Sequence, residues 1–400
     1  RTRCATRSPP LLEHRRAEAA QINEQFYQEL CYRPGESKPK FLARHHVGPG
    51  PVDPEQLPYY LLLVGGPSDI PFQFQYQLDV QYAVGRICFD RLEDYARYAR
   101  SVVEAETRPR PRPRPRQMAL LATSHPDDRA TQNSCRHLAR PLVDALEKRW
   151  AAGSKELPPG EPSWVFEQVL ADEATKANLT RRMGGDATAP VLFCACHGVG
   201  FEDGDANQRL RQGALLCQDW PGPRRWRAAI PNDFYFSADD VADDADLSGV
   251  IAFFFACYGA GTPRFDEFSH QASSRRQIAP EGFVAGLPQR LLAHPRRGAL
   301  AVVGHVDRAW GYSFAWPQAP RQVSVFTSAL GRLLEGYPIG AAMEYFNQRY
   351  AELSSDLNVE IENVRYGMQP DLLSLSGMWT ANNDARSYVV LGDPAVRLAL

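Results

Sequence analysis

The sequence lacks an uninterrupted apolar run of about 18 residues, the length that a membrane-spanning helix needs. It also lacks an excess of charge, because 45 basic and 47 acidic residues give a net charge of −2. The first residues do not have the pattern of a secretory signal peptide. Near-balanced charge gives no reason to expect a nucleic acid or an anionic membrane as a partner, so we predict neither.

Cysteine is also scarce, with eight residues in a chain of 400. This is too few for a fold held together by disulfides, and it favours a reducing, cytoplasmic setting. Several of the cysteines lie inside apolar runs, where a small hydrophobic side chain fits: Cys88, Cys194, Cys196 and Cys217.

The segment Cys194-Ala-Cys196-His197 has the residue types of a metal site. In a strand, however, the side chains of Cys194 and Cys196 would point away from that of His197, because successive side chains alternate between faces. No second cysteine pair with metal-ligand spacing occurs elsewhere in the sequence. We therefore predict no metal and no cofactor.

Two short apolar runs each end at a chemically reactive residue. The run beginning at Val250 stops at Cys257, which Gly259 and Gly261 follow, and an earlier run stops at His197-Gly198. Such runs, ended by turn residues, are typical of strands buried on both faces of a parallel sheet. The carboxyl ends of parallel strands meet at one edge, so the pattern predicts a thiol nucleophile beside an imidazole base.

The predicted chemistry assigns Cys257 as the nucleophile and His197 as the general base and acid. The backbone N–H groups of Gly198 and Cys257 are candidates to bind the developing oxyanion, since such donors need no side chain. The sequence does not choose a third group to orient the imidazole.

Strand-like and helix-like patterns alternate along the chain, which predicts an α/β fold with a mostly parallel sheet covered by helices on both faces. The predicted strands are 59–64, 78–87, 118–123, 164–170, 190–196, 250–256, 300–303 and 388–391, and the predicted helices are 10–33, 92–106, 135–150, 174–183, 323–335 and 339–353. We predict a lead-in over 1–58, a first sub-domain over 59–116 that ends in an Arg-Pro connector, and a catalytic sub-domain over 117–400.

A strand ending in His-Gly followed by a strand ending in Ala-Cys resembles the caspase-like clan of cysteine peptidases. Within the clan, the chain looks most like gingipain-type peptidases and bacterial CHAT domains. Three further segments carry the resemblance: 61–71, 298–304 and 388–394. The resemblance implies a caspase-like three-layer sandwich. It implies a Cys-His dyad that forms an acyl-enzyme with a protein or peptide substrate. It also implies activation by a sensor domain or partner protein and a role in bacterial defence.

The resemblance also implies that an acidic residue selects arginine or lysine before the scissile bond. In gingipain-type enzymes it lies in a segment of the form Asp-x-x-Tyr-x-x-Gly-Arg, which here begins at Asp79. An ordinary solvated carboxylate is the alternative role for Asp79, and other sources of the same charge are Asp203, Asp205 and Asp233. Another branch of the clan has aspartate two residues before the cysteine, where this chain has Phe255.

Two other functions stay open: an inactive binding module of the same fold, and a thiol-dependent acyl hydrolase that does not cut peptides. The alternating Arg-Pro segment of residues 108–116 is expected to be an exposed connector, and a basic peptide that binds a partner is the alternative. Within it, proline protects most bonds, so only Arg116–Gln117 is a candidate for self-cleavage. A set of aromatic residues could line a substrate groove or form a local core: Trp220, Trp226, Phe234, Tyr235 and Phe236.

Overall fold

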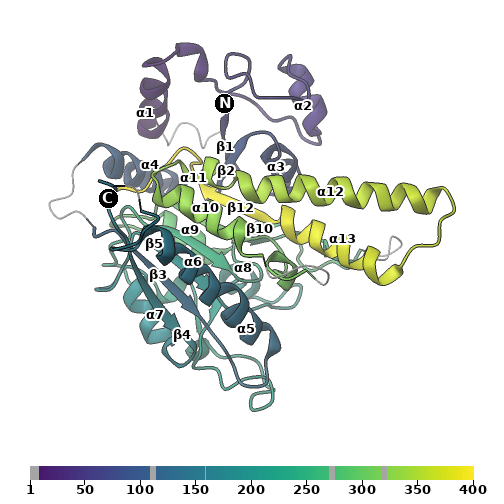
Figure 1. Ribbon diagram of the computed structural model, residues 1–400. Coiled ribbons are helices and arrows are strands. Elements are labelled where there is room, and N and C mark those ends of the chain that lie inside the picture. The colour runs from purple at the N-terminus through teal and green to yellow at the C-terminus, as the bar shows by residue number, and fades with distance from the viewer. Residues whose placement is uncertain (1–8, 109–113, 158, 270–274, 317–321) are drawn as a thin grey trace.

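The computed structural model describes residues 9–108, 114–157, 159–269, 275–316 and 322–400. Its centre is one eight-stranded sheet in the order β1-β2-β12-β11-β8-β5-β3-β4 (Figure 1). The strands are β1 Tyr60–Val64, β2 Ala83–Ile87, β3 Gln117–Ala122, β4 Val165–Leu170, β5 Val191–Ala195, β8 Ile251–Phe255, β11 Ala301–His305 and β12 Tyr388–Gly392. The neighbours from β11 to β4 are parallel, whereas β12 runs antiparallel to β11.

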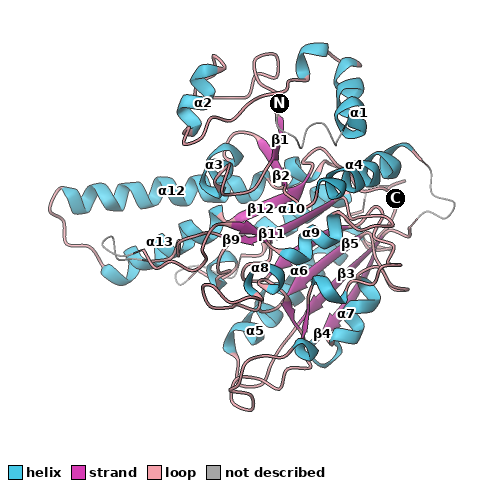
Figure 2. Ribbon diagram, turned by 180° about the vertical axis from the view of Figure 1, so that it is seen from behind, coloured by secondary structure: helices cyan, strands magenta, loops and turns pink. Residues whose placement is uncertain are grey.

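Helices lie in front of the sheet and behind it, as the opposite views of Figures 1 and 2 show. They are α1 Pro9–Ala20, α2 Lys38–Arg44, α3 Phe72–Asp79, α4 Leu92–Thr107, α5 Arg129–Ser134, α6 Arg140–Trp150, α7 Lys176–Arg182, α8 Gln208–Arg211, α9 Gly286–Leu292, α10 Ser324–Leu334, α11 Ile339–Ala342, α12 Glu344–Arg365 and α13 Leu372–Arg386. Two-stranded ribbons pair β6 Leu215–Leu216 with β7 Tyr235–Phe236, and β9 Gly261–Thr262 with β10 Phe283–Val284. The predicted α/β class with a mostly parallel sheet is confirmed.

An aromatic cluster fixes the two central strands against the helices. The rings of Phe193 on β5 and Phe253 on β8 stack with centroids 5.1 Å apart, and Phe326 of α10 contacts both. Full burial of each such ring stabilises the fold by about 2 kcal/mol. Because β5 and β8 precede His197 and Cys257, this core sets the position of the predicted reactive residues.

The predicted strands that precede the reactive residues are confirmed, but three helical segments differ from expectation. The predicted helix over 10–33 ends at Ala20, and Ile22 is 80% exposed. There the side chain of Asn23 accepts a hydrogen bond from Gln25 N and starts a separate 3₁₀ turn. Residues 72–79 fold as α3 and residues 372–386 as α13, neither of which was predicted.

The segments on either side of residue 116 belong to the same sheet, with β1 and β2 at one end of it. The predicted sub-domain boundary therefore falls between two elements of one sheet. The backbone carbonyl of Arg116 accepts a hydrogen bond from Val165 N, and Gln117 opens β3. This pairing protects the Arg116–Gln117 bond in the folded chain, so the structure gives no support to self-cleavage there. Residues 109–113 of the connector lie outside the described residues.

No helix in the described part of the chain has both the length and the apolar composition that crossing a bilayer requires.

Candidate active site

His197 and Cys257 stand at equivalent positions beyond two neighbouring strands. In the parallel pairing of β5 with β8, Ala195 is opposite Phe255, and Cys196 N donates to Phe255 O at 3.2 Å. His197 and Cys257 each lie two residues past this pair, at the edge where parallel strands deliver functional side chains. The structure thus brings the two predicted reactive residues to the same edge of the sheet.

Gly198 packs directly against the backbone of the cysteine. A Cβ atom at position 198 would lie 1.7 Å from the carbonyl oxygen of Cys257, a distance no side chain can occupy. The backbone at position 198 also pairs with Leu215 of the β6–β7 ribbon, through hydrogen bonds made by the residues on either side of it. Glycine is therefore required for the His197 loop and the Cys257 loop to lie together.

A third loop, after β3, supplies a partner for the histidine that the sequence did not reveal. The Nε2 atom of His197 lies 2.6 Å from Oδ2 of Asp128, and the side chains are 35% and 12% exposed. Asp128 is itself held in place, because it caps α5 by accepting from Ala130 N and also accepts from the Thr131 hydroxyl. Its position beyond the strand next to β5 is the one signal that could have identified it.

The electrostatics of this pair favour a charged carboxylate. Burial raises the pKa of Asp128, but the hydrogen bond and charge of His197 and the donors from Thr131 and Ala130 outweigh burial and hold the pKa at about 2. A carboxylate in that state only accepts hydrogen bonds. Nε2 of His197 must therefore carry the shared proton, which leaves Nδ1 free to accept one from another group.

The thiol of Cys257 rests in a partly enclosed position. Its Sγ atom lies 3.8 Å from the backbone carbonyl of Ala309, to which the thiol can donate a weak hydrogen bond. Burial raises the pKa of Cys257, Asp307 acts in the same direction, and the backbone N–H of Gly198 acts against them. The thiol is therefore protonated at neutral pH and needs a base to become nucleophilic.

The turn after β11, residues 306–310, forms the wall beside the thiol. Tyr258 N donates to Asp307 O at 2.6 Å, which ties this turn to the residue after the nucleophile. The Asp307 carboxylate accepts from Glu267 N and Arg308 N, and burial raises the pKa of Asp307 to about 6. The guanidinium of Arg308 pairs with Asp266 and lies over the rings of Phe268 and Trp310.

Among the described residues, none of the predicted specificity residues Asp79, Asp203 and Asp233 forms a hydrogen bond or ion pair with this wall. Asp79 is the last residue of α3, where its Oδ1 accepts from Val84 N, and burial raises its pKa well above the usual range. The first residue of the same helix, Phe72, is the one that contacts the Cys257 loop, at Gly261. The helix separates Phe72 from Asp79 by about 10 Å along its axis.

Asp203 and Asp233 are both exposed. The carboxylate of Asp203 accepts a hydrogen bond from Gln277. Asp233 lies in a 3₁₀ turn before β7. Among the described residues, neither carboxylate forms a hydrogen bond or ion pair with Cys257 or His197.

The aromatic residues of the long insertion form a local core rather than a groove lining. Trp220 and Tyr235 are buried in one hydrophobic cluster, and Trp226 and Phe234 pack against it with ring centroids 5.0 Å apart. Phe236 joins the main core. The cluster supports the β6–β7 ribbon, which in turn holds the loop of His197.

All seven described cysteines are free thiols. Among the described residues, the His, Cys, Asp and Glu side chains close enough to share a metal ion are His14, Glu18 and Glu106. The Arg15 guanidinium already donates to Glu106 and to Asp393, so this group is a network of ion pairs tying α1 to α4 and to the end of β12. The predicted absence of a metal stays a prediction.

Comparison with known proteins places this chain in a family. A model of peptidase family C25 matches residues 47–399. No curated protein matches the chain. The solved structure of the Arg-specific cysteine proteinase gingipain R is similar, with 12% sequence identity, a TM-score of 0.48, and coverage of 86% of this chain and 65% of that chain.

A complex of the Porphyromonas gingivalis RgpB pro- and mature domains is similar at 11% identity, with a TM-score of 0.44 and coverage of 86% and 66%. Separase in the Saccharomyces cerevisiae separase–securin complex is similar at 8% identity, with a TM-score of 0.38 and coverage of 84% and 16%. The chain thus spans about two thirds of the gingipain chains it matches. Because the family model spans most of its length, the chain belongs to peptidase family C25, and the predicted resemblance to gingipain-type cysteine peptidases of the caspase-like clan is confirmed.

Proposed function

We propose that this chain is a cysteine endopeptidase in which Cys257 is the nucleophile, His197 the general base and acid, and Asp128 the residue that orients His197. The observation that carries the proposal is the hydrogen bond from His197 to Asp128 at the strand edge that also holds Cys257. A thiol, a base and an orienting carboxylate are the parts that nucleophilic catalysis by cysteine uses.

The proposed reaction begins when Nδ1 of His197 takes the proton of the Cys257 thiol and Sγ bonds to the carbonyl carbon of the scissile peptide. The N–H groups of Gly198 and Cys257 stabilise the oxyanion of the tetrahedral intermediate. The C–N bond then breaks, the leaving amine takes the proton from His197, and an acyl-enzyme remains. Water, deprotonated by His197, releases the acid and restores the thiol.

We propose a preference for a basic residue before the scissile bond, on the grounds of local charge. Beside Cys257, the carboxylates of Asp266 and Asp307 share the single guanidinium of Arg308, which lies 3.6 Å from Asp307 at Nε. In the described part of the chain, one cation for these two carboxylates leaves a negative excess that a substrate arginine or lysine would neutralise. This wall replaces Asp79, Asp203 and Asp233 as the proposed source of selectivity.

The test is a set of fluorogenic peptides that differ only in the residue before the cut: arginine, lysine, aspartate or leucine. We expect the basic peptides to be cleaved with a kcat/KM at least about tenfold above the others. Cys257→Ala, purified in the same way, controls for contaminating proteases. If no peptide is hydrolysed but small acyl esters are, the proposed endopeptidase activity is refuted and a thiol acyl hydrolase is favoured.

A further inference from the structure

The helices α12 and α13 form a hairpin that extends beyond the body of the molecule, as both opposite views show (Figures 1 and 2). Along its 22 residues, α12 buries only Phe346 and Leu357. Leu353, Leu357 and Ile361 recur every four residues and form a stripe along one face, as in an amphipathic helix. Among the described residues, α12 packs mainly against α13, and α10 and α11 cover it as well.

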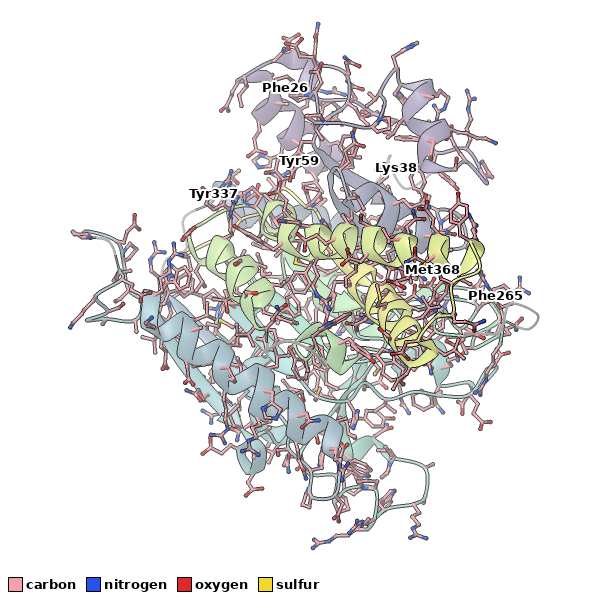
Figure 3. All side chains as sticks on the ribbon, turned by 45° about the vertical axis from the view of Figure 1, so that its right-hand side comes forward. Phe26, Lys38, Tyr59, Phe265, Tyr337 and Met368 are labelled. Atoms are coloured by element: carbon pink, nitrogen blue, oxygen red, sulfur yellow. The ribbon has the colours of Figure 1, made fainter. Side chains whose placement is uncertain are left out.

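The far end of the hairpin exposes large apolar side chains. We call residues 359–373 the hairpin tip. Tyr366 is 87% exposed, Leu373 84% and Leu372 74%. The remaining exposed apolar residues of the tip are Met368, which Figure 3 labels, Val359 and Val364. Soluble proteins seldom expose so many neighbouring apolar side chains without a partner to cover them.

The charge of the same region defines the chemistry of that partner. The hairpin tip carries the carboxylates of Glu360, Glu362 and Asp371 and one guanidinium, that of Arg365, which gives a net charge of −2. This charge opposes an anionic membrane, and it opposes a second copy docked tip to tip, because both would bring like charges together. An amphipathic helix with one apolar face and lysine or arginine beside it complements both features.

The base of the hairpin contacts the wall of the active site. Asp384 of α13 accepts from Trp310 N at 2.8 Å and from the Ser313 hydroxyl at 2.6 Å. The next residue toward the tip, Asn383, donates to Glu267 O at 3.0 Å. These contacts hold the segment that includes Ala309, whose carbonyl faces the Cys257 thiol. A shift of α13 would therefore move the wall beside the nucleophile.

We propose that the hairpin tip is the docking surface for a basic amphipathic helix of a partner protein, and that docking controls the wall beside Cys257 through Asp384. The proposal that the tip binds a partner does not depend on the protein being an enzyme. The proposal that binding controls the wall beside Cys257 rests on the proposed peptidase function. Docking would bury the exposed apolar side chains of the tip, which is favourable. Because two of them, Leu372 and Leu373, belong to the first turn of α13, a docked partner would also restrain that helix.

The binding arm uses the Cys257→Ala protein, so that it does not depend on activity. The probe is a synthetic helical peptide of leucine and lysine, and its counterpart carries glutamate in place of lysine. The tip variant is Tyr366→Ser with Leu373→Ser, and the control is Ile22→Ser, which changes an equally exposed residue of another segment. We expect the tip variant to weaken the Kd of the lysine peptide by at least about tenfold and the control to leave it unchanged.

Equal binding of the glutamate peptide, or equal affinity in the tip variant, would overturn the docking surface. A dimer in sedimentation that the tip variant abolishes would overturn it in favour of a second copy. Tip-dependent binding to phosphatidylserine vesicles would overturn it in favour of a membrane. All proteins are compared by circular dichroism first, and the exposed positions of the tip substitutions spare the core.

The activity arm measures cleavage of a short fluorogenic peptide by the active protein. We expect saturating lysine peptide to change kcat in the wild type but not in Asp384→Asn or Ser313→Ala, with its Kd unchanged in both. An unaltered wild-type kcat despite binding would overturn the control of the wall. Absence of any peptidase activity would refute the proposed function instead, and the binding arm would stand.

Discussion

Nε2 of His197 lies 2.6 Å from Oδ2 of Asp128, across two loops that follow neighbouring parallel strands. The contact connects residues 69 apart in the sequence. The contact fixes Nε2 as the protonated nitrogen of the imidazole. It leaves Nδ1 as the nitrogen that can accept the proton of a thiol. The sequence predicted a dyad, whereas the structure adds a carboxylate in the position of a third member.

Replacement of this carboxylate tests its role directly. We expect Asp128→Asn to lower kcat by about 10²-fold, because the amide no longer favours the Nε2-protonated imidazole or stabilises its charged form. The measurement is steady-state hydrolysis of the best fluorogenic peptide. The matched control is Asp127→Asn, since Asp127 pairs with Arg224 and its positive φ of 64° suits asparagine. Equal losses in the two variants would contradict the assignment.

The same carboxylate predicts an acid-sensitive part of stability. The pKa of Asp128 is about 2 when folded and 3.8 as a free side chain. A lowered folded pKa contributes stability that is present above pH 4 and is lost as pH falls toward 2, and the amount is about 2 kcal/mol. Urea unfolding at pH 7 and pH 2.5 should show a smaller pH dependence in Asp128→Asn. An identical dependence in both proteins would show that the pair is not formed in solution.

Asp307 is expected to make the stability of the fold depend on pH in the opposite direction, and over a different pH range. Burial raises its folded pKa to about 6, above the 3.8 of the free side chain. The folded state therefore binds more protons between these values, and stability falls as pH rises from about 4 to 6. Asp307→Asn keeps an acceptor for Arg308 N and should remove this part of the fall in urea unfolding. A fall in the variant that is as steep as in the wild type, or steeper, would contradict the raised pKa.

Gly198 gives a steric test of the contact between the two reactive loops. The Cβ of Gly198→Ala would lie 1.7 Å from Cys257 O, so the loops must separate and activity should fall by at least about tenfold. The control is Gly200→Ala, whose Cβ would lie 3.5 Å from the Tyr258 ring, an ordinary contact. Both variants are compared by peptide hydrolysis and thermal unfolding. Full activity in Gly198→Ala would contradict the described packing.

The sequence identified the strands that carry the site because continuous apolar runs such as 251–256 have one stable location, the interior of a parallel sheet. The residues that follow these runs are His197, Gly198 and Cys257, and the sequence therefore identified them as candidates. It did not identify α13, whose segment mixes Leu372 and Leu373 with serine, glycine and asparagine and has no apolar stripe. That helix is held by buried contacts such as the one between Asp384 and Ser313, which exist only after folding.

Asp128 and Asp79 both show that the residue type of a carboxylate does not reveal its role. Asp128 is one acid of an adjacent pair in a loop, and only the neighbouring position of β3 and β5 makes it a partner of His197. Asp79 matched a short motif, yet the motif says nothing of α3, which places this residue at the end remote from Gly261. Long-range position, rather than residue type, decides the role of each carboxylate.

The most direct test of the central claim is covalent labelling of the thiol by a peptidyl electrophile with arginine at its reactive end, read by mass spectrometry of the intact chain and of its tryptic peptides. We predict one label, on Cys257, formed at a rate that His197→Ala lowers by about 10²-fold or more. The other free thiols, such as Cys31, which is exposed, serve as the internal control. Labelling spread over several cysteines, or a rate at Cys257 that His197→Ala leaves unchanged, would contradict the account.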